Sequence, residues 1–184
     1  MRIVRSWPKD QPSDHPFVMD NCERVYIDTV DYRPLIDIGE NFIHLDWDIA
    51  VERNRLRDFV RKCEAEPDVV RVGPYKGYPT RRWHHKWAWA NHEKWYVWKT
   101  DEARLQRIEL KPGDPYCHWF APGMMYMPFD LWKEFYDDEG YKVICEGFPD
   151  WYHVKHGWTD WPVEWDLNAI HLNYSMRDVM VDVK

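Results

Sequence analysis

Two aspartates, Asp46 and Asp48, stand one residue apart at the end of an apolar run, in the stretch FIHLDWDIAV. If this run is a strand, its side chains alternate between the two faces, so both carboxylates point to the same side. Two converging carboxylates repel each other unless a positive charge lies between them, and hard divalent cations prefer oxygen ligands. The spacing therefore predicts a Mn²⁺ or Mg²⁺ site shared with phosphate oxygens. A solvated turn with Asp48 as a helix N-cap is the alternative that this pattern leaves open.

The segments around the aspartates indicate a strand, a helix and a second strand. Residues 41–45 form a short apolar run of the kind found in buried strands. Apolar residues then recur every three or four positions, which predicts an amphipathic helix over residues 52–66 that Pro67 ends. Residues 69–72, VVRV, predict the second strand. A unit of this length favours a parallel crossover and an α/β sheet, in which ligands bind beyond the carboxyl ends of the strands.

The rest of the chain shows weaker patterns. Residues 1–40 are polar and contain prolines, so we expect mostly loop around one or two strands. Further predicted elements are a short strand over 24–27, a functional loop or small subdomain over 75–114, a buried strand over 123–127, a helix from Pro128 to near Gly140, and a short strand over 143–145.

Composition and charge bound the class of protein. The chain has 184 residues and a net charge of −7, which favours one domain without a global field that would attract nucleic acid. No run of apolar residues is long enough to span a bilayer, so we expect a soluble intracellular protein. The four cysteines form no CxxC pair and are expected to be reduced core thiols. The 13 Trp and 11 Tyr exceed what a core of this size needs, which favours a binding surface for some of them.

The motifs and their order resemble a known family. The stretch IHLDWDIAV is similar to the metal-binding DxD strand of nucleotide-sugar glycosyltransferases of the GT-A fold. WFAPGMMYMP, residues 119–128, resembles a strand beside the donor sugar in glycogenin-like members, and AIHLNY, residues 169–174, resembles a late segment that supplies a histidine to the same metal. The order of these motifs, with VGPYKGYP, is also similar to that of small glycosyltransferase-like proteins encoded by bacteriophages.

The resemblance implies a fold and a set of ligands. Asp46 and Asp48 would bind the metal, Mn²⁺ or Mg²⁺, and the diphosphate, Gly123 would lie beside the donor sugar, and His171 would complete the metal shell. The expected fold is a single compact α/β domain with a mixed, mostly parallel sheet flanked by helices, a reduced GT-A architecture. Its expected parts are a shortened N-terminal nucleotide-binding part (1–40), the DxD strand with its helix and a Trp/His-rich insertion (41–128), and an acceptor side with the C-terminal metal-ligand segment (129–184). The expected location is the cytoplasm, that of the host for a phage-encoded chain.

Sugar transfer from a nucleoside diphosphate also requires groups besides the metal. An inverting enzyme needs a base near the acceptor hydroxyl, and the segment GWTDWPVEWD offers Asp160 or Glu164, whereas a retaining enzyme needs no such base. Tyr75 and Lys76 follow the second strand and are candidates to contact the nucleotide or the sugar, with Lys76 neutralising phosphate. The nucleotide-sugar donor is the expected partner. The acceptor stays open between a modified DNA base, a protein and a glycan.

Two other functions compete with transfer. A noncatalytic, Trp-rich module that binds carbohydrate or protein would also account for the aromatic content. A metal-dependent hydrolase would use His153, His156 and a nearby Asp. The spacing of the two histidines suits one helical face, but nearby Gly and Pro residues disfavour a helix there. A local basic face built from Arg81, Arg82 and Lys86 would allow contact with a nucleic-acid backbone.

Overall fold

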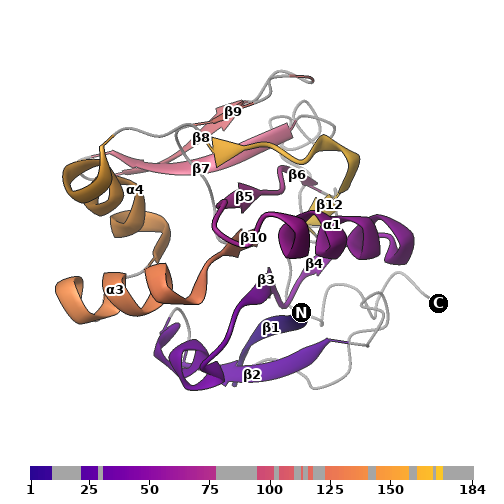
Figure 1. The fold of residues 1–184 in the computed structure, drawn as a ribbon. Helices are drawn as coiled ribbons and strands as arrows, with labels where there is room; N and C mark the ends of the chain where they lie inside the picture. Colours follow the sequence, from indigo (N-terminus) through magenta and orange to yellow (C-terminus); the bar gives the residue numbers. More distant parts are fainter. Residues whose placement is uncertain are drawn as a thin grey trace.

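The computed structural model describes most of the chain. The described residues are 1–9, 22–28, 31–77, 95–101, 104–109, 113, 116–117, 123–140, 144–157, 161–167 and 169–171. Within them, the strands form two five-stranded sheets and a two-stranded ribbon, combined with helices in a mixed α/β fold (Figure 1).

The first sheet has the order β2-β1-β3-β10-β5. Its strands are β1 (Arg2–Pro8), β2 (Glu23–Ile27), β3 (Phe42–Asp46), β5 (Arg71–Val72) and β10 (Met124–Met127). Strand β1 pairs in parallel with β2 and β3, whereas β10 is antiparallel to both β3 and β5. Strands β3 and β5 therefore run in the same direction, joined by helix α1 (Arg53–Ala65), and the predicted crossover is confirmed with β10 inserted between its two strands.

Alternation along these strands divides the core into two layers. On one face, Ile43 and Leu45 of β3 pack with the predicted apolar stripe of α1, which contributes Leu56, Phe59 and Cys63. Burial of Cys63 raises the pKa of its thiol to about 12, as expected for an unreactive core cysteine. On the other face, Phe42 packs with residues from two further helices, which include Trp132 and Phe148. The central sheet thus lies between α1 and a helical layer on its far side (Figure 1).

That helical layer consists of α3 (Phe129–Glu139) and α4 (Ile144–His156). Helix α3 begins after Pro128 and ends at Gly140, as predicted. The predicted strand over 143–145 is wrong, because the described part of that segment begins α4. Phe148 of α4 is fully buried against Phe135 of α3, with ring centroids 5.6 Å apart, and this packing outweighs the low helix propensity of the Gly and Pro residues in the segment.

The second sheet has the order β4-β12-β6-β7-β8. Its strands are β4 (Ile49–Ala50), β12 (Ala169–His171), β6 (Tyr75–Gly77), β7 (Trp95–Asp101) and β8 (Arg104–Glu109), and the ribbon pairs β9 (Tyr116–Cys117) with β11 (Trp161–Pro162). Only β12 and β6 pair in parallel among these strands, so the expectation of one mostly parallel sheet is too simple. The difference arises because β10 is antiparallel to both of its neighbours in the first sheet and because residues 75–114, predicted as a loop or subdomain, contain the β7–β8 hairpin.

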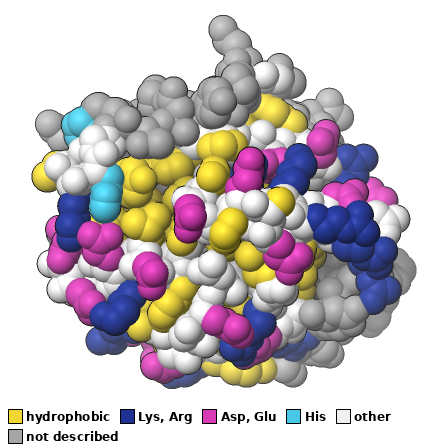
Figure 2. Space-filling model, viewed as in Figure 1, with side chains coloured by type: hydrophobic (Ala, Val, Ile, Leu, Met, Phe, Trp, Pro, Cys, Tyr) yellow, Lys and Arg dark blue, Asp and Glu magenta, His cyan; other side chains and the backbone are white. Residues whose placement is uncertain are grey.

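The surface carries both signs of charge. In Figure 2, acidic and basic side chains are interspersed over the visible face, and hydrophobic side chains show between them. None of the helices that the structure describes has the length and apolarity needed to cross a membrane.

Candidate functional site

The carboxyl end of β3 is a junction between the two sheets. Asp46 is the last residue of β3, and its backbone N–H donates to the carbonyl of Gly123 over 2.8 Å. The chain then turns through Trp47 and Asp48 and enters β4 at the edge of the second sheet. This is the position at which α/β sheets bind ligands.

The Asp46 carboxylate is held by one of its two oxygens. Oδ1 accepts hydrogen bonds from the hydroxyl of Ser6, over 3.0 Å, and from the hydroxyl of Tyr32, over 3.3 Å. The Nε2 atom of His44 lies 3.9 Å from the same oxygen. The side chain of Asp46 keeps 24% of its surface exposed, so the carboxylate is anchored and still reachable.

Asp48 does not continue the strand, which corrects the simple alternation argument. It lies in the turn between β3 and β4 and is 6% exposed. The alternative role as an N-cap is also wrong, because Glu52 occupies that position before α1. The turn between β3 and β4, and not the alternation of a strand, therefore sets the direction of the Asp48 carboxylate.

A buried arginine shapes this turn. The Nη1 atom of Arg5, on β1, donates to the carbonyl of Asp46 over 2.9 Å and to the carbonyl of Ile49 over 2.8 Å. Arg5 is 3% exposed, and its guanidinium joins the residues at the two ends of the turn. Arg5, Ser6 and Tyr32 were not among the predicted site residues. For Arg5 and Ser6 the available signal was two polar residues between the apolar pairs Ile3-Val4 and Trp7-Pro8, whereas Tyr32 has no such local signal.

Gly123 and Tyr75 meet beside Asp46. A Cβ atom on Gly123 would lie 2.9 Å from Cε1 of Tyr75, so a larger residue has no room there unless the ring moves. Tyr75 is 3% exposed and belongs to the core behind α1. Tyr75 thus packs against the backbone of Gly123, the residue whose carbonyl accepts from the Asp46 N–H. For Lys76 the structure describes the backbone in β6, and its side chain lies outside the described residues.

The strand that carries His171 lies next to this junction. Strand β12 pairs on one side with β4, where His171 is opposite Ile49, and on the other with β6, where His171 is opposite Gly77. The backbone thus brings the position of His171 beside the residue that follows Asp48. The His171 side chain lies outside the described residues, and the described side chains alone form no group of three metal-ligating residues.

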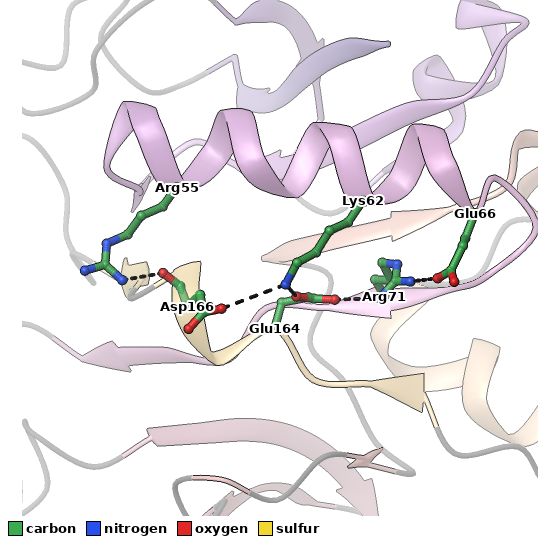
Figure 3. Close-up of polar contacts among 6 residues, drawn as sticks. All are labelled: Arg55, Lys62, Glu66, Arg71, Glu164 and Asp166. Carbon is green, nitrogen blue, oxygen red and sulfur yellow. Dashed lines mark hydrogen bonds and ion pairs between the residues drawn. The ribbon is translucent and has the colours of Figure 1, made fainter.

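Glu164 has a different environment from Asp46, although both were candidate site residues. Its two oxygens accept from Lys62 Nζ and from Arg71 Nη1, each over 2.6 Å, and Arg71 also contacts Glu66 (Figure 3). Glu164 is 6% exposed, and its backbone N–H donates to the carbonyl of Val72 at the sheet edge. Both oxygens of this carboxylate are therefore used in contacts within the fold. This contact pattern is that of a structural ion pair.

A shallow groove adjoins this ion pair. It has a volume of about 340 Å³ and is lined by Arg55, Asp58, Phe59, Lys62, Glu164, Asp166 and Leu167. Arg55 donates to the backbone carbonyl of Asp166 over 2.5 Å, and Lys62 lies 3.9 Å from the carboxylate of Asp166 (Figure 3). These contacts tie α1 to the segment before β12. Asp160, the other predicted base, lies outside the described residues.

The two histidines of the competing hydrolase hypothesis lie on a helix after all. His153 and His156 are in the last turn of α4. Nε2 of His156 is 3.3 Å from Glu134, and its ring stacks on Tyr152 with centroids 4.7 Å apart. These contacts belong to the packing of α4 on α3, and within the described residues no third metal ligand joins them.

Comparisons with known proteins indicate the fold. No protein-family model matches the chain, and no curated protein matches it. Among solved structures, the chain is similar to "A197 from STIV", with a TM-score of 0.58 and 14% sequence identity over 95% of this chain and 87% of that one. At this identity the similarity extends to the fold, which is a mixed α/β domain shared along nearly the whole chain.

Proposed function

We propose that this protein is a metal-dependent glycosyltransferase that moves a sugar from a nucleoside-diphosphate donor to an acceptor. The observation that carries the proposal is the junction beyond β3, where Asp46 is anchored by one oxygen and the turn is held by Arg5. The resemblance of the DxD, glycine and AIHLNY segments to nucleotide-sugar transferases supports the same reading.

The donor set suits a hard divalent cation. Asp46 and Asp48 offer carboxylate oxygens, which Mn²⁺ and Mg²⁺ accept, and His171 offers an imidazole that Mn²⁺ also accepts. Both hydrogen bonds that the Asp46 carboxylate accepts from described residues reach Oδ1, so its second oxygen is available for a cation. When bound, the metal supplies charge neutralisation of the leaving diphosphate.

The remaining residues of the proposed site have supporting roles. Gly123 leaves room for the ring of Tyr75 to pack against the backbone beside Asp46, so these two residues support the position of the Asp46 strand end. For an inverting reaction, Asp160 is the better candidate base, since both oxygens of Glu164 are engaged by cations. A Trp-rich binding module is the alternative function, but Trp7, Trp132, Trp151 and Trp161 lie buried in the described core and offer it little surface.

Calorimetric titration with a panel of nucleoside diphosphates and nucleotide sugars, with and without Mn²⁺, tests this proposal. We expect Mn²⁺-dependent binding in the wild type that Asp46→Asn and Asp48→Asn abolish. Asp37→Asn, at an exposed aspartate in the 3₁₀ helix Arg33–Ile38, is the matched control and should bind as the wild type does. Absence of binding to every donor by a folded wild-type protein would overturn the transferase proposal and favour the binding module.

A further inference from the structure

Two buried hydroxyl groups, those of Ser6 and Tyr32, donate hydrogen bonds to the Asp46 carboxylate. Ser6 is 1% exposed and lies directly opposite Asp46 in the β1–β3 register, so its hydroxyl has a fixed position. Tyr32 is 6% exposed, and its ring meets the ring of His44 edge to face at a centroid distance of 5.4 Å. Both hydroxyls are therefore held in place by packing as well as by Asp46.

Both hydroxyls donate to the same carboxylate oxygen. Oδ1 of Asp46 accepts from Ser6 over 3.0 Å and from Tyr32 over 3.3 Å, whereas no described residue donates to Oδ2. A cation that took both oxygens would compete with two buried hydroxyl donors for Oδ1. Leaving such donors without an acceptor is costly, so coordination through Oδ2 alone is favoured.

We propose that Ser6 and Tyr32 set the metal specificity of the site by keeping Asp46 a one-oxygen ligand. This inference rests on the proposed function, because it concerns the metal of that same site. Mg²⁺, and Mn²⁺ in the same octahedral oxygen geometry, take single oxygens from a small number of carboxylates. Ca²⁺ takes six to eight oxygens, often with both oxygens of a carboxylate. One-oxygen coordination at Asp46 therefore disfavours Ca²⁺.

Titration of Mn²⁺ and of Ca²⁺ without nucleotide, followed by calorimetry, tests the inference. The variants are Tyr32→Phe, which removes one oxygen atom, and Ser6→Ala combined with Tyr32→Phe. Because each variant frees Oδ1, we expect the ratio of Mn²⁺ to Ca²⁺ affinity to fall by about tenfold in the double variant, chiefly through tighter Ca²⁺ binding. Tyr32→Phe alone should show part of this change, and it keeps the experiment decisive if the double variant does not fold.

Tyr126→Phe is the matched control. The hydroxyl of Tyr126 is also buried, but it donates to the carbonyl of Pro67 over 2.6 Å, away from Asp46. It should leave the affinity ratio unchanged. An unchanged ratio in the Ser6 and Tyr32 variants, with Mn²⁺ binding intact, overturns this inference and leaves the proposed transferase in place. A wild-type protein that binds neither cation, with or without the nucleoside diphosphates used above, overturns both.

Discussion

Asp46, at the end of β3, and Glu164, beside β5, are two carboxylates near the same sheet. They differ in what their oxygens contact. Asp46 accepts two hydroxyl donors at one oxygen and keeps about a quarter of its side chain exposed, at 24%. Glu164 is bound at both oxygens by cationic side chains and its side chain is 8% exposed. Asp46 therefore keeps one carboxylate oxygen for a ligand, whereas both oxygens of Glu164 are used in contacts within the fold. The distribution of partners over the two oxygens thus separates a candidate ligand from a structural ion pair.

The largest effect should come from removing Glu164. Glu164→Leu leaves Arg71 buried with Glu66 as its remaining partner, so we expect a loss of about 3 kcal/mol in the free energy of unfolding, at the low end for a broken buried pair. Urea denaturation measures this loss.

Asp46→Asn, which keeps an oxygen for Ser6 and Tyr32, should lower the free energy of unfolding by less than about 1 kcal/mol while losing Mn²⁺ binding. If Glu164→Leu is as stable as the wild type and loses only transferase activity, Glu164 does not form the structural ion pair that this contrast with Asp46 requires.

Arg5 tests whether the turn itself matters. In Arg5→Met the carbonyls of Asp46 and Ile49 lose a charged donor, which should lower the free energy of unfolding by about 2 kcal/mol. Because the turn also carries Asp48, Mn²⁺ affinity should fall with it, and hydrogen exchange of the amides at residues 47–49 should accelerate. Unchanged exchange in this turn, measured beside the amides of α1 as a reference, would contradict the role given to Arg5.

Lys62 should matter much less than Arg71 to the Glu164 ion pair. Its side chain is 45% exposed, so water screens its contact with Glu164, and Lys62→Met should change the free energy of unfolding by at most about 1 kcal/mol. Thermal unfolding at low and high salt gives the measurement, and any difference from the wild type should shrink as salt is added. A loss as large as that of Glu164→Leu would show that the exposed half of the pair carries the stability.

The smallest expected effect is the pH dependence of stability that comes from Asp31, the residue before Tyr32. Hydrogen bonds from Arg33 lower the pKa of Asp31 below its ordinary value of 3.8, so the charged form is favoured in the folded state. The stability that Asp31 contributes is therefore present above this ordinary value and is lost as the pH falls through the lower folded-state pKa. Urea midpoints at about pH 5 and about pH 3 should differ more for the wild type than for Asp31→Asn. Equal differences would show that the contact with Arg33 does not favour the charged form of Asp31 in the folded state.

Strong local patterns predicted the elements that carry the site. The apolar stripe of α1 and the apolar runs of β3 and β10 were recognised because burial imposes a period on the sequence, and Pro128 and Gly140 marked the ends of α3. The roles assigned to Asp46, Asp48, Gly123 and His171 stay predictions until binding is measured.

The missed elements have physical reasons. One or two strands were predicted within residues 1–40, but β1 was not located because its sequence, RIVRSWP, contains two buried polar residues, Arg5 and Ser6. These two residues are polar because they contact Asp46 and its turn, so the contacts that build the candidate site also concealed the strand. Helix α4 was missed because Gly147 and Pro149 disfavour helix locally, whereas aromatic packing and polar contacts with α3 outweigh them. In both cases the stabilising contacts come from residues that are not adjacent in the sequence, so local patterns do not reveal them.

The insertion of β10 between β3 and β5 has a consequence for folding during synthesis. A ribosome releases β3, α1 and β5 well before residues 124–127, and until then β3 and β5 lack the strand that both of them pair with. A nascent chain that ends near Gly77 should therefore display two open strand edges that promote aggregation or chaperone binding. The pairing of β10 with both strands closes this gap in one step, so the central sheet and the ligand junction at its carboxyl end should acquire their native form late and together.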